Sequence, residues 1–102
     1  MAHKYHAKPV TIDGWRFAST KEGNRYCELK LLLKAHIIND LLLQPHFTFT
    51  VNGKAVFKYV ADFEYIEAGK RVIEDVKGFK TPVYRLKKKL IEAQHGIKIT
   101  EV

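Results

Sequence analysis

Cysteine is almost absent from this chain of 102 residues, in which Cys27 is the single thiol. One cysteine excludes an intrachain disulfide and a zinc site built from several thiolates. The 5 histidines are scattered without the spacing of a zinc site. The sequence also lacks an apolar run of transmembrane length and, near its start, the apolar segment of a signal peptide. These absences favour a cytoplasmic protein without a membrane partner.

Acidic residues are in the minority, with 11 Asp and Glu against 18 Lys and Arg, so that the formal net charge is +7. Such an excess favours an anionic partner, and nucleic acid ahead of a membrane surface. A basic but merely solvated surface is the alternative. Hydrophobic residues make up 46% of the chain, enough to form a core rather than a disordered chain. We predict a single domain over residues 1–102.

The first 18 residues mix basic and aromatic side chains. Asp13-Gly14 favours a tight turn, so we predict an extended arm over residues 1–18, or a short hairpin. A lid over the core, with Trp15 and Phe17 buried, is compatible with either. The cations of the arm are candidate contacts to a phosphate backbone: Lys4, Lys8 and Arg16.

A helix is predicted from Ser19 or Thr20 to about His36, because either residue is a good N-cap and Glu22 completes a capping box with Ser19. Its buried stripe follows the spacing i, i+4, i+7, i+11: Glu22, Tyr26, Leu29 and Leu33. Glu22 therefore lies in line with the buried face at its amino-terminal end. This feature alone favours a capping role and a catalytic role equally.

Three strands are predicted to follow as a meander, over residues 46–51, 55–66 and 71–77. Asn52-Gly53 supplies the positive φ angles of a type I′ turn, and Gly69 lies in the second turn. Residues 41–45 are predicted to be an apolar connection that Pro45 ends. Both faces of the second strand carry apolar residues, so we expect helices to cover both faces of the sheet, at least in part.

Thr81-Pro82 predicts the start of a second helix, and Gly96 predicts its end. Its expected buried stripe is Val83, Leu86, Leu90 and Ala93. The other faces are basic, and three lysines are candidate phosphate contacts: Lys80, Lys87 and Lys88. For any single lysine, solvated surface charge is the alternative. A last strand from Ile97 follows a helical crossover and is therefore expected to be parallel to the third. The fold class is α/β, a mixed four-stranded sheet flanked by helices.

Charged residues interrupt the two central strands, where a buried charge needs a partner or a metal. Alternation places Asp75 and Lys77 on one face of the third strand and Glu74 on the other. Asp62, on the preceding strand, can converge with Asp75 on one divalent cation, with the carbonyl of Val76 as a further ligand. Cross-strand ion pairs on an exposed face are the alternative.

Such a site suits phosphodiester hydrolysis, because Mg²⁺ stabilises charge on phosphoryl oxygens and acidifies an attacking water. We expect Mn²⁺ to substitute for it. Lys77 would lie beside the same phosphate, where it orients or deprotonates water or offsets charge in the transition state. Glu22 could approach from the helix as a ligand or as a group that holds water. Gln44 and Tyr84 are candidate accessory residues, although Gln44 could equally cap a backbone group.

The order helix, three strands, helix, strand, with Asp62 and Asp75-Val76-Lys77, resembles the PD-(D/E)XK nuclease superfamily. More closely, the chain is similar to a family of small phage and prophage proteins of that type. The matching stretches cover nearly the whole chain: Lys4-Tyr5, Asp13-Gly14, Phe17, Glu22, Arg25-Tyr26, Glu28-Leu29, Leu43-Gln44-Pro45, Ala61-Asp62-Phe63, Glu74-Asp75-Val76-Lys77-Gly78, and Thr81 through Tyr84 to Lys87-Lys88. The block from residue 74 to residue 78 is the most specific of them.

The resemblance implies a restriction-endonuclease-like αβββαβ core, with Asp62 and Asp75 as metal ligands. It also implies that Lys77 is the catalytic lysine and Glu22 the acid of the helix. The proline of the superfamily's name is absent, since Ala61 precedes Asp62, but that position varies among its members.

These observations together predict a Mg²⁺-dependent endodeoxyribonuclease, phage-encoded and active in the bacterial cytoplasm. A short chain offers little surface for reading a long sequence, which favours branched or junction DNA as substrate. A homodimer would supply the second active site for a second strand. The alternative from another class is a non-catalytic nucleic-acid-binding protein with the same fold. A metal-free RNA-binding module has less support, because aromatic residues are not grouped on one exposed strand face.

Overall fold

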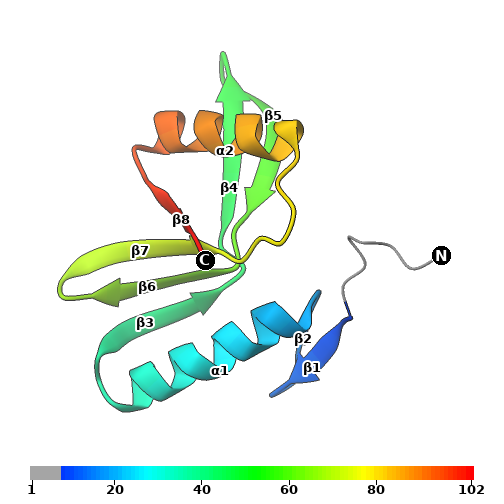
Figure 1. The fold of residues 1–102 in the computed structure, drawn as a ribbon. Coiled ribbons are helices and arrows are strands. Elements are labelled where there is room, and N and C mark those ends of the chain that lie inside the picture. Colours follow the sequence, from blue (N-terminus) through cyan, green and yellow to red (C-terminus); the bar gives the residue numbers. More distant parts are fainter. Residues whose placement is uncertain (1–7) are drawn as a thin grey trace.

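The computed structural model describes residues 8–102, so the predicted phosphate contact Lys4 lies outside the described residues. In chain order the elements are β1 (Val10–Ile12), β2 (Trp15–Phe17), α1 (Thr20–Lys34), β3 (Ile38–Leu43), β4 (His46–Val51), β5 (Lys54–Val60), β6 (Phe63–Glu67), β7 (Lys70–Asp75), α2 (Pro82–His95) and β8 (Ile99–Glu101). They form an α/β fold with a mixed sheet and two separate hairpins (Figure 1). Within this described part, no helix is long and apolar enough to span a membrane.

The sheet has the strand order β3-β6-β7-β8, antiparallel except at its last pair. The predicted parallel final strand is confirmed, and its register places Glu101 beside Asp75. The predicted hairpin near the start is confirmed as well, since β1 and β2 pair across a turn in which Asp13 and Gly14 have φ of 54° and 81°.

A bend separates the antiparallel pair β3–β6 from the antiparallel pair β4–β5. The predicted strand over residues 55–66 breaks at Ala61 and Asp62 into β5 and β6, and residues 41–45 are not a connection, because β3 extends to Leu43. At the bend the backbone N–H of Gln44 donates to the carbonyl of Asp62 at 2.9 Å, and that of Ala61 donates to Pro45 at 3.0 Å. Strands β4 and β5 therefore continue β3 and β6 but project away from the sheet (Figure 1).

Because of the bend, side chains from one face of residues 55–66 pack into two different hydrophobic cores. Tyr59 and Ala61, before the bend, pack with Ile91 of α2. Phe63 and Tyr65, after it, belong to the core that includes Tyr26 and Leu29 of α1. The two helices therefore cover opposite faces of the sheet, as the sequence predicts.

The start of α1 follows the prediction, with Ser19 as N-cap and its hydroxyl accepting from the backbone N–H of Glu22 at 3.1 Å. The buried side of the helix carries Gly23, Tyr26 and Leu29, whereas Leu33 is exposed, contrary to the predicted stripe. A Cβ at Gly23 would lie 2.7 Å from Val10 Cγ2. The hairpin β1–β2 thus packs directly against the first half of α1, whereas in the last turn Leu32, rather than Leu33, packs against the core.

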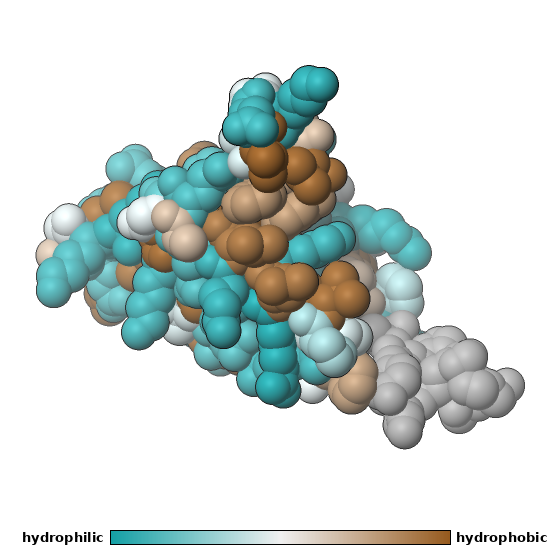
Figure 2. All heavy atoms as spheres, turned by 90° about the horizontal axis from the view of Figure 1, so that it is seen from above, coloured by the Kyte–Doolittle hydropathy of each residue, from teal (hydrophilic) through white to brown (hydrophobic). Residues whose placement is uncertain are grey.

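The buried stripe predicted for α2 is wrong. Val83 and Leu86 are 61% and 59% exposed, whereas Ile91 is fully buried. Figure 2 views the molecule from the side on which α2 and the β4–β5 hairpin lie, and it shows apolar side chains gathered among hydrophilic ones. The half-buried Lys87 and Lys88 lie nearer the core, because a lysine can cover apolar surface with its aliphatic stem.

Candidate functional site

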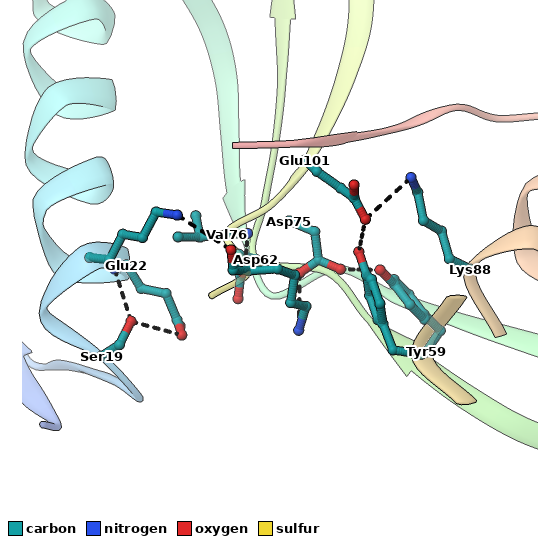
Figure 3. Close-up of polar contacts among 11 residues, drawn as sticks. Ser19, Glu22, Tyr59, Asp62, Asp75, Val76, Lys88 and Glu101 are labelled. Atoms are coloured by element: carbon teal, nitrogen blue, oxygen red, sulfur yellow. Dashed lines mark hydrogen bonds and ion pairs between the residues drawn. The ribbon is translucent and has the colours of Figure 1, made fainter. Parts of the chain in front are cut away.

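Asp62 and Asp75 meet where two neighbouring strands end. Asp62 directly precedes β6 and Asp75 is the last residue of β7. The backbone N–H of Asp62 donates to the carbonyl of Glu74 at 3.0 Å, and Asp62 Oδ2 accepts from the N–H of Val76 at 2.6 Å. The two carboxylates therefore lie close together, as predicted (Figure 3), and their joint binding of a cation stays a prediction.

Asp75 is fully buried and only partly satisfied. One oxygen, Oδ2, accepts a hydrogen bond from the hydroxyl of Tyr59. The other, Oδ1, has no hydrogen-bond partner in residues 8–102, and the ammonium of Lys77 lies 3.5 Å from it. A buried carboxylate oxygen without a hydrogen bond costs free energy. A cation at this oxygen would remove that cost.

The pKa of Asp62 also indicates that a cation would be stabilising at this place. Burial raises the pKa of the Asp62 carboxyl to about 8, and the neighbouring Asp75 and Glu22 add to the rise, while the hydrogen bond from the Val76 N–H opposes it. Two carboxylates this close repel each other when both are ionised. A divalent cation would reverse that repulsion.

Glu22 lies at the N-terminus of α1, close to the paired carboxylates. The hydroxyl of Ser19 donates to Glu22 Oε2 at 3.2 Å, which supports the capping role. Its charge also raises the pKa of Asp62, which places it near the site. Figure 3 shows Asp62 between Glu22 on α1 and Asp75 on β7. Glu22 therefore caps the helix beside the paired carboxylates.

The chemistry of these residues fits a hard divalent cation. Asp62 and Asp75 would hold it, with the carbonyl of Val76 as the predicted third oxygen. In residues 8–102 no three or more His, Cys, Asp or Glu side chains group as a metal centre. The remaining ligands would be waters, which Mg²⁺ characteristically keeps. A cavity of about 300 Å³ lies between α1 and Val76, next to the paired carboxylates but not lined by them.

The other predicted residues divide between three places. Tyr84 adjoins the site, with its ring 6.2 Å from that of Tyr59 and 5.0 Å from the ammonium of Lys77. Gln44 contributes its backbone at the bend, while its side chain is exposed. Lys87 lies over the ring of Phe57 on the β4–β5 hairpin.

The remaining predicted phosphate contacts form two groups. Lys80 and Lys88 both pair with Glu101 of β8, at 3.1 and 3.6 Å. Lys8 and Arg16 are exposed, at and near the β1–β2 hairpin that packs on α1. Helix α2 and this hairpin lie on opposite sides of the sheet (Figure 1). The structure therefore brings together the four central residues but not all of the predicted cations.

Sequence reasoning missed two residues of the site, Tyr59 and Glu101. Tyr59 donates to Asp75, and burial, then this hydrogen bond, raise the pKa of its hydroxyl above the usual value. Glu101 accepts from the hydroxyl of Tyr84 at 2.9 Å. The predicted parallel pairing of the last strand could have placed Glu101 near Asp75, but no local pattern points to Tyr59, because its contact depends on the bend.

Glu74 lies on the opposite face from Asp75, as alternation predicts. Arg25 of α1 donates to both of its carboxylate oxygens, at 2.9 and 2.6 Å, and the hydroxyl of Tyr65 also donates to it. This buried ion pair joins α1 to β7. It therefore fixes the helix that carries Glu22 against the strand that carries Asp75.

We expect the stability of the metal-free protein to depend on the protonation of Asp62. The pKa of about 8 in the folded protein lies above the usual value for an unfolded chain, about 3.9. The resulting stabilisation is complete below pH 4 and is lost as the pH rises to about 8. Between these pH values the free energy of unfolding of the wild type should fall by on the order of 2 kcal/mol relative to that of Asp62→Asn. This is less than the whole pKa difference would give, because Asp62 is partly exposed.

Urea unfolding of both proteins in EDTA, at pH values from 4.5 to 8.5, measures this difference. Mg²⁺ should restore stability to the wild type at high pH and leave the variant unchanged. A difference between the two proteins that does not vary with pH would contradict the assignment.

The fold and the site define an α/β protein in which two carboxylates meet at the end of a sheet strand, beside a basic helix. The chain belongs to the family described as "Protein of unknown function (DUF1064)", whose model matches residues 2–101. Neither the curated proteins nor the solved structures gave a match to the chain. Its function must therefore be argued from the site itself.

Proposed function

We propose that this protein is a Mg²⁺-dependent endodeoxyribonuclease with a core of the PD-(D/E)XK type. The observation that carries the proposal is the paired Asp62 and Asp75 at one strand end, with the unsatisfied oxygen of Asp75 facing Lys77 at 3.5 Å. These are the two acids and the lysine of the superfamily motif. The element order supports it too, because β3–β4 and β5–β6, each taken as one bent strand, give the order αβββαβ.

In this mechanism Asp62, Asp75 and the carbonyl of Val76 hold Mg²⁺, or Mn²⁺ in its place. The bound metal supplies stabilisation of phosphoryl charge and a more acidic attacking water. Lys77 offsets negative charge in the transition state, and its contact with the ring of Tyr84 positions its ammonium. Tyr59 fixes the orientation of Asp75 through its hydrogen bond. Glu22 orients a water on the opposite side of Asp62.

The proposed substrate is DNA. It is contacted through the two groups of cations described above, Lys8 with Arg16 and Lys80 with Lys88, together with Lys87 and Lys4. Both helices begin on the side of the molecule toward which β7 runs (Figure 1), and the positive end of a helix dipole favours phosphate there. The chain is short, so selection of branched or junction DNA by shape is proposed over sequence reading. Equal cutting of linear duplex and four-way junctions would contradict this choice.

A homodimer is proposed for cleavage of two strands. The exposed Val83 and Leu86 of α2 offer apolar surface that a second copy would cover. A strictly monomeric mass by light scattering, free and on a junction, would contradict it. The proposed setting is the cytoplasm of a bacterial cell, with the protein encoded by a phage.

We expect the purified protein to nick supercoiled plasmid and cut a synthetic four-way junction with Mg²⁺ or Mn²⁺, and to do neither in EDTA. The metal is required because a phosphodiester transition state builds charge that the carboxylates alone would repel. Gel analysis of the two substrates over a time course measures both reactions. Cutting that persists in EDTA would contradict the proposed chemistry.

The alternative is a nucleic-acid-binding protein that does not cleave. The observation that favours it is a second, cationic cavity beside α2 that needs no metal to attract an anion. This alternative predicts DNA binding without cutting under every metal condition, and the same experiment separates the two functions.

A further inference from the structure

A cavity of about 390 Å³ lies beside β8 and α2, outside the paired carboxylates. Its lining is dominated by cations: Lys80, Arg85, Lys88, Lys89, Glu92 and Glu101. The four cations and two carboxylates leave it an excess of two positive charges. A concave, positively charged surface of this size attracts an oxyanion.

Both carboxylates of the cavity already have partners. Glu92 accepts from the backbone N–H of Ile99 at 2.8 Å, which fixes the end of α2 to β8. Glu101 pairs with Lys80 and Lys88 and accepts from Tyr84. Neither Arg85 nor Lys89 has an ion pair with any residue of the described part, and both are exposed. Two cations of the cavity are therefore uncompensated.

Glu101 connects this cavity to the paired carboxylates. It is the register partner of Asp75 in the parallel pair β7–β8, and neighbouring strands lie about 4.8 Å apart. Figure 3 shows Glu101 between Asp75 and Lys88. The cavity therefore adjoins the paired carboxylates across β8, so an anion in the cavity and a phosphate at Asp75 would be neighbours.

We propose that the cavity formed by Arg85, Lys89, Lys80 and Lys88 binds an internal backbone phosphate of the DNA strand, adjacent to the phosphate that is cleaved. This assignment rests on the proposed function for the identity of the anion. Arginine and lysine provide the donors for phosphate oxygens. Glu101 holds Lys80 and Lys88 in position when the cavity is empty, and the phosphate competes with it when DNA binds.

Removal of the two uncompensated cations should weaken DNA binding and reduce its salt dependence. Each phosphate contact contributes about 0.9 to the slope of log K against log salt concentration, so Arg85→Ala/Lys89→Ala should lower that slope by about 1–2. We expect affinity at low salt to fall at least about tenfold. Fluorescence anisotropy with a labelled duplex, from 50 to 300 mM salt, measures both quantities.

The measurement uses the full chain with Asp75→Asn in EDTA, so that it does not depend on cleavage. The matched control is Lys34→Ala/Lys70→Ala, which removes the same charge at the ends of α1 and of the β6–β7 turn. This control should keep its slope. Equal slope losses in the two double variants, or none in Arg85→Ala/Lys89→Ala, would overturn the site. Cleavage by the wild type is measured in a separate experiment. If the wild type does not cleave DNA, the binding slopes still test the phosphate site.

Two further arms sharpen the assignment. With a dumbbell duplex, which has no free ends, Arg85→Ala/Lys89→Ala should lose as much slope as with a linear duplex. A loss seen only with linear duplexes that carry a terminal phosphate would contradict binding of an internal phosphate. Glu101→Gln should tighten binding severalfold, because it releases Lys80 and Lys88. Weaker binding of this variant with an unchanged melting temperature would overturn the competition between Glu101 and phosphate.

Discussion

Asp75→Asn is expected to reduce Mg²⁺-dependent cleavage about 10³-fold or more while leaving the fold intact. A metal supplies several kcal/mol of transition-state stabilisation in such sites, and each 1.36 kcal/mol is a factor of ten in rate. Asparagine keeps an acceptor for the hydroxyl of Tyr59 but removes the charge that would hold the cation. Single-turnover cleavage of a junction, with saturating protein, measures the change without contributions from product release.

The folding control for this variant is its melting temperature in EDTA, which we expect to equal or exceed that of the wild type. The reason is that Asp75 is fully buried with one oxygen unsatisfied, so loss of its charge removes a cost. Isothermal titration should show loss of Mg²⁺ binding, and DNA binding in EDTA should persist. Cleavage within tenfold of the wild type would contradict the role of Asp75.

Arg25→Ala is expected to destabilise the protein by about 2–3 kcal/mol, because it leaves Glu74 buried without its charge partner. Glu74 is only 2% exposed, and the Arg25 guanidinium donates to both of its oxygens. The hydrogen bond from Tyr65 remains and limits the loss. The hydrogen bonds to Glu74 raise the pKa of Arg25 further above its usual value, so the guanidinium stays charged. Chemical unfolding at pH 7 measures the difference in free energy.

The chain provides a matched control on the same side chain. Arg25 also pairs with Glu28 at 3.1 Å, but Glu28 is 65% exposed, and exposed pairs contribute less than about 1 kcal/mol. Glu28→Ala should therefore change stability little. In the double variant Arg25→Met/Glu74→Gln, where no charge is left buried, much of the lost stability should return. Equal losses of stability in Arg25→Ala and Glu28→Ala would contradict a larger contribution from the buried pair than from the exposed one.

The buried pair also has a positional consequence. It holds α1 against β7, and α1 carries Glu22 to the neighbourhood of Asp62. Loosening it should therefore shift Glu22 relative to the paired carboxylates as well as lower stability. Metal affinity of Arg25→Ala, measured below its unfolding transition, separates these two effects.

Local sequence signals were sufficient wherever a contact lies within a few residues. Ser19 caps α1 and Thr81 caps α2, because each hydroxyl reaches a backbone N–H three residues ahead. Asn52-Gly53 makes its turn because both residues adopt positive φ. The period of two placed Asp75 and Glu74 on opposite faces of β7. The pairing of Asp62 with Asp75 followed from the same reasoning, since antiparallel neighbours have few possible registers.

The sequence by itself therefore determined the two helices with their caps, the tight turns, the proximity of Asp62 to Asp75, and the basic character of α2. Only the tertiary structure decided the bend at Asp62, since both halves of residues 55–66 have one alternating pattern and packing against two different cores divides them. The same is true of α2, whose apolar residues fit two helical stripes until Ile91 packs against Ile73 and Ile99. The contacts of Tyr59 and Glu101 depend on these choices. They join residues distant in sequence, and burial against the whole fold, rather than any local preference, sets their positions.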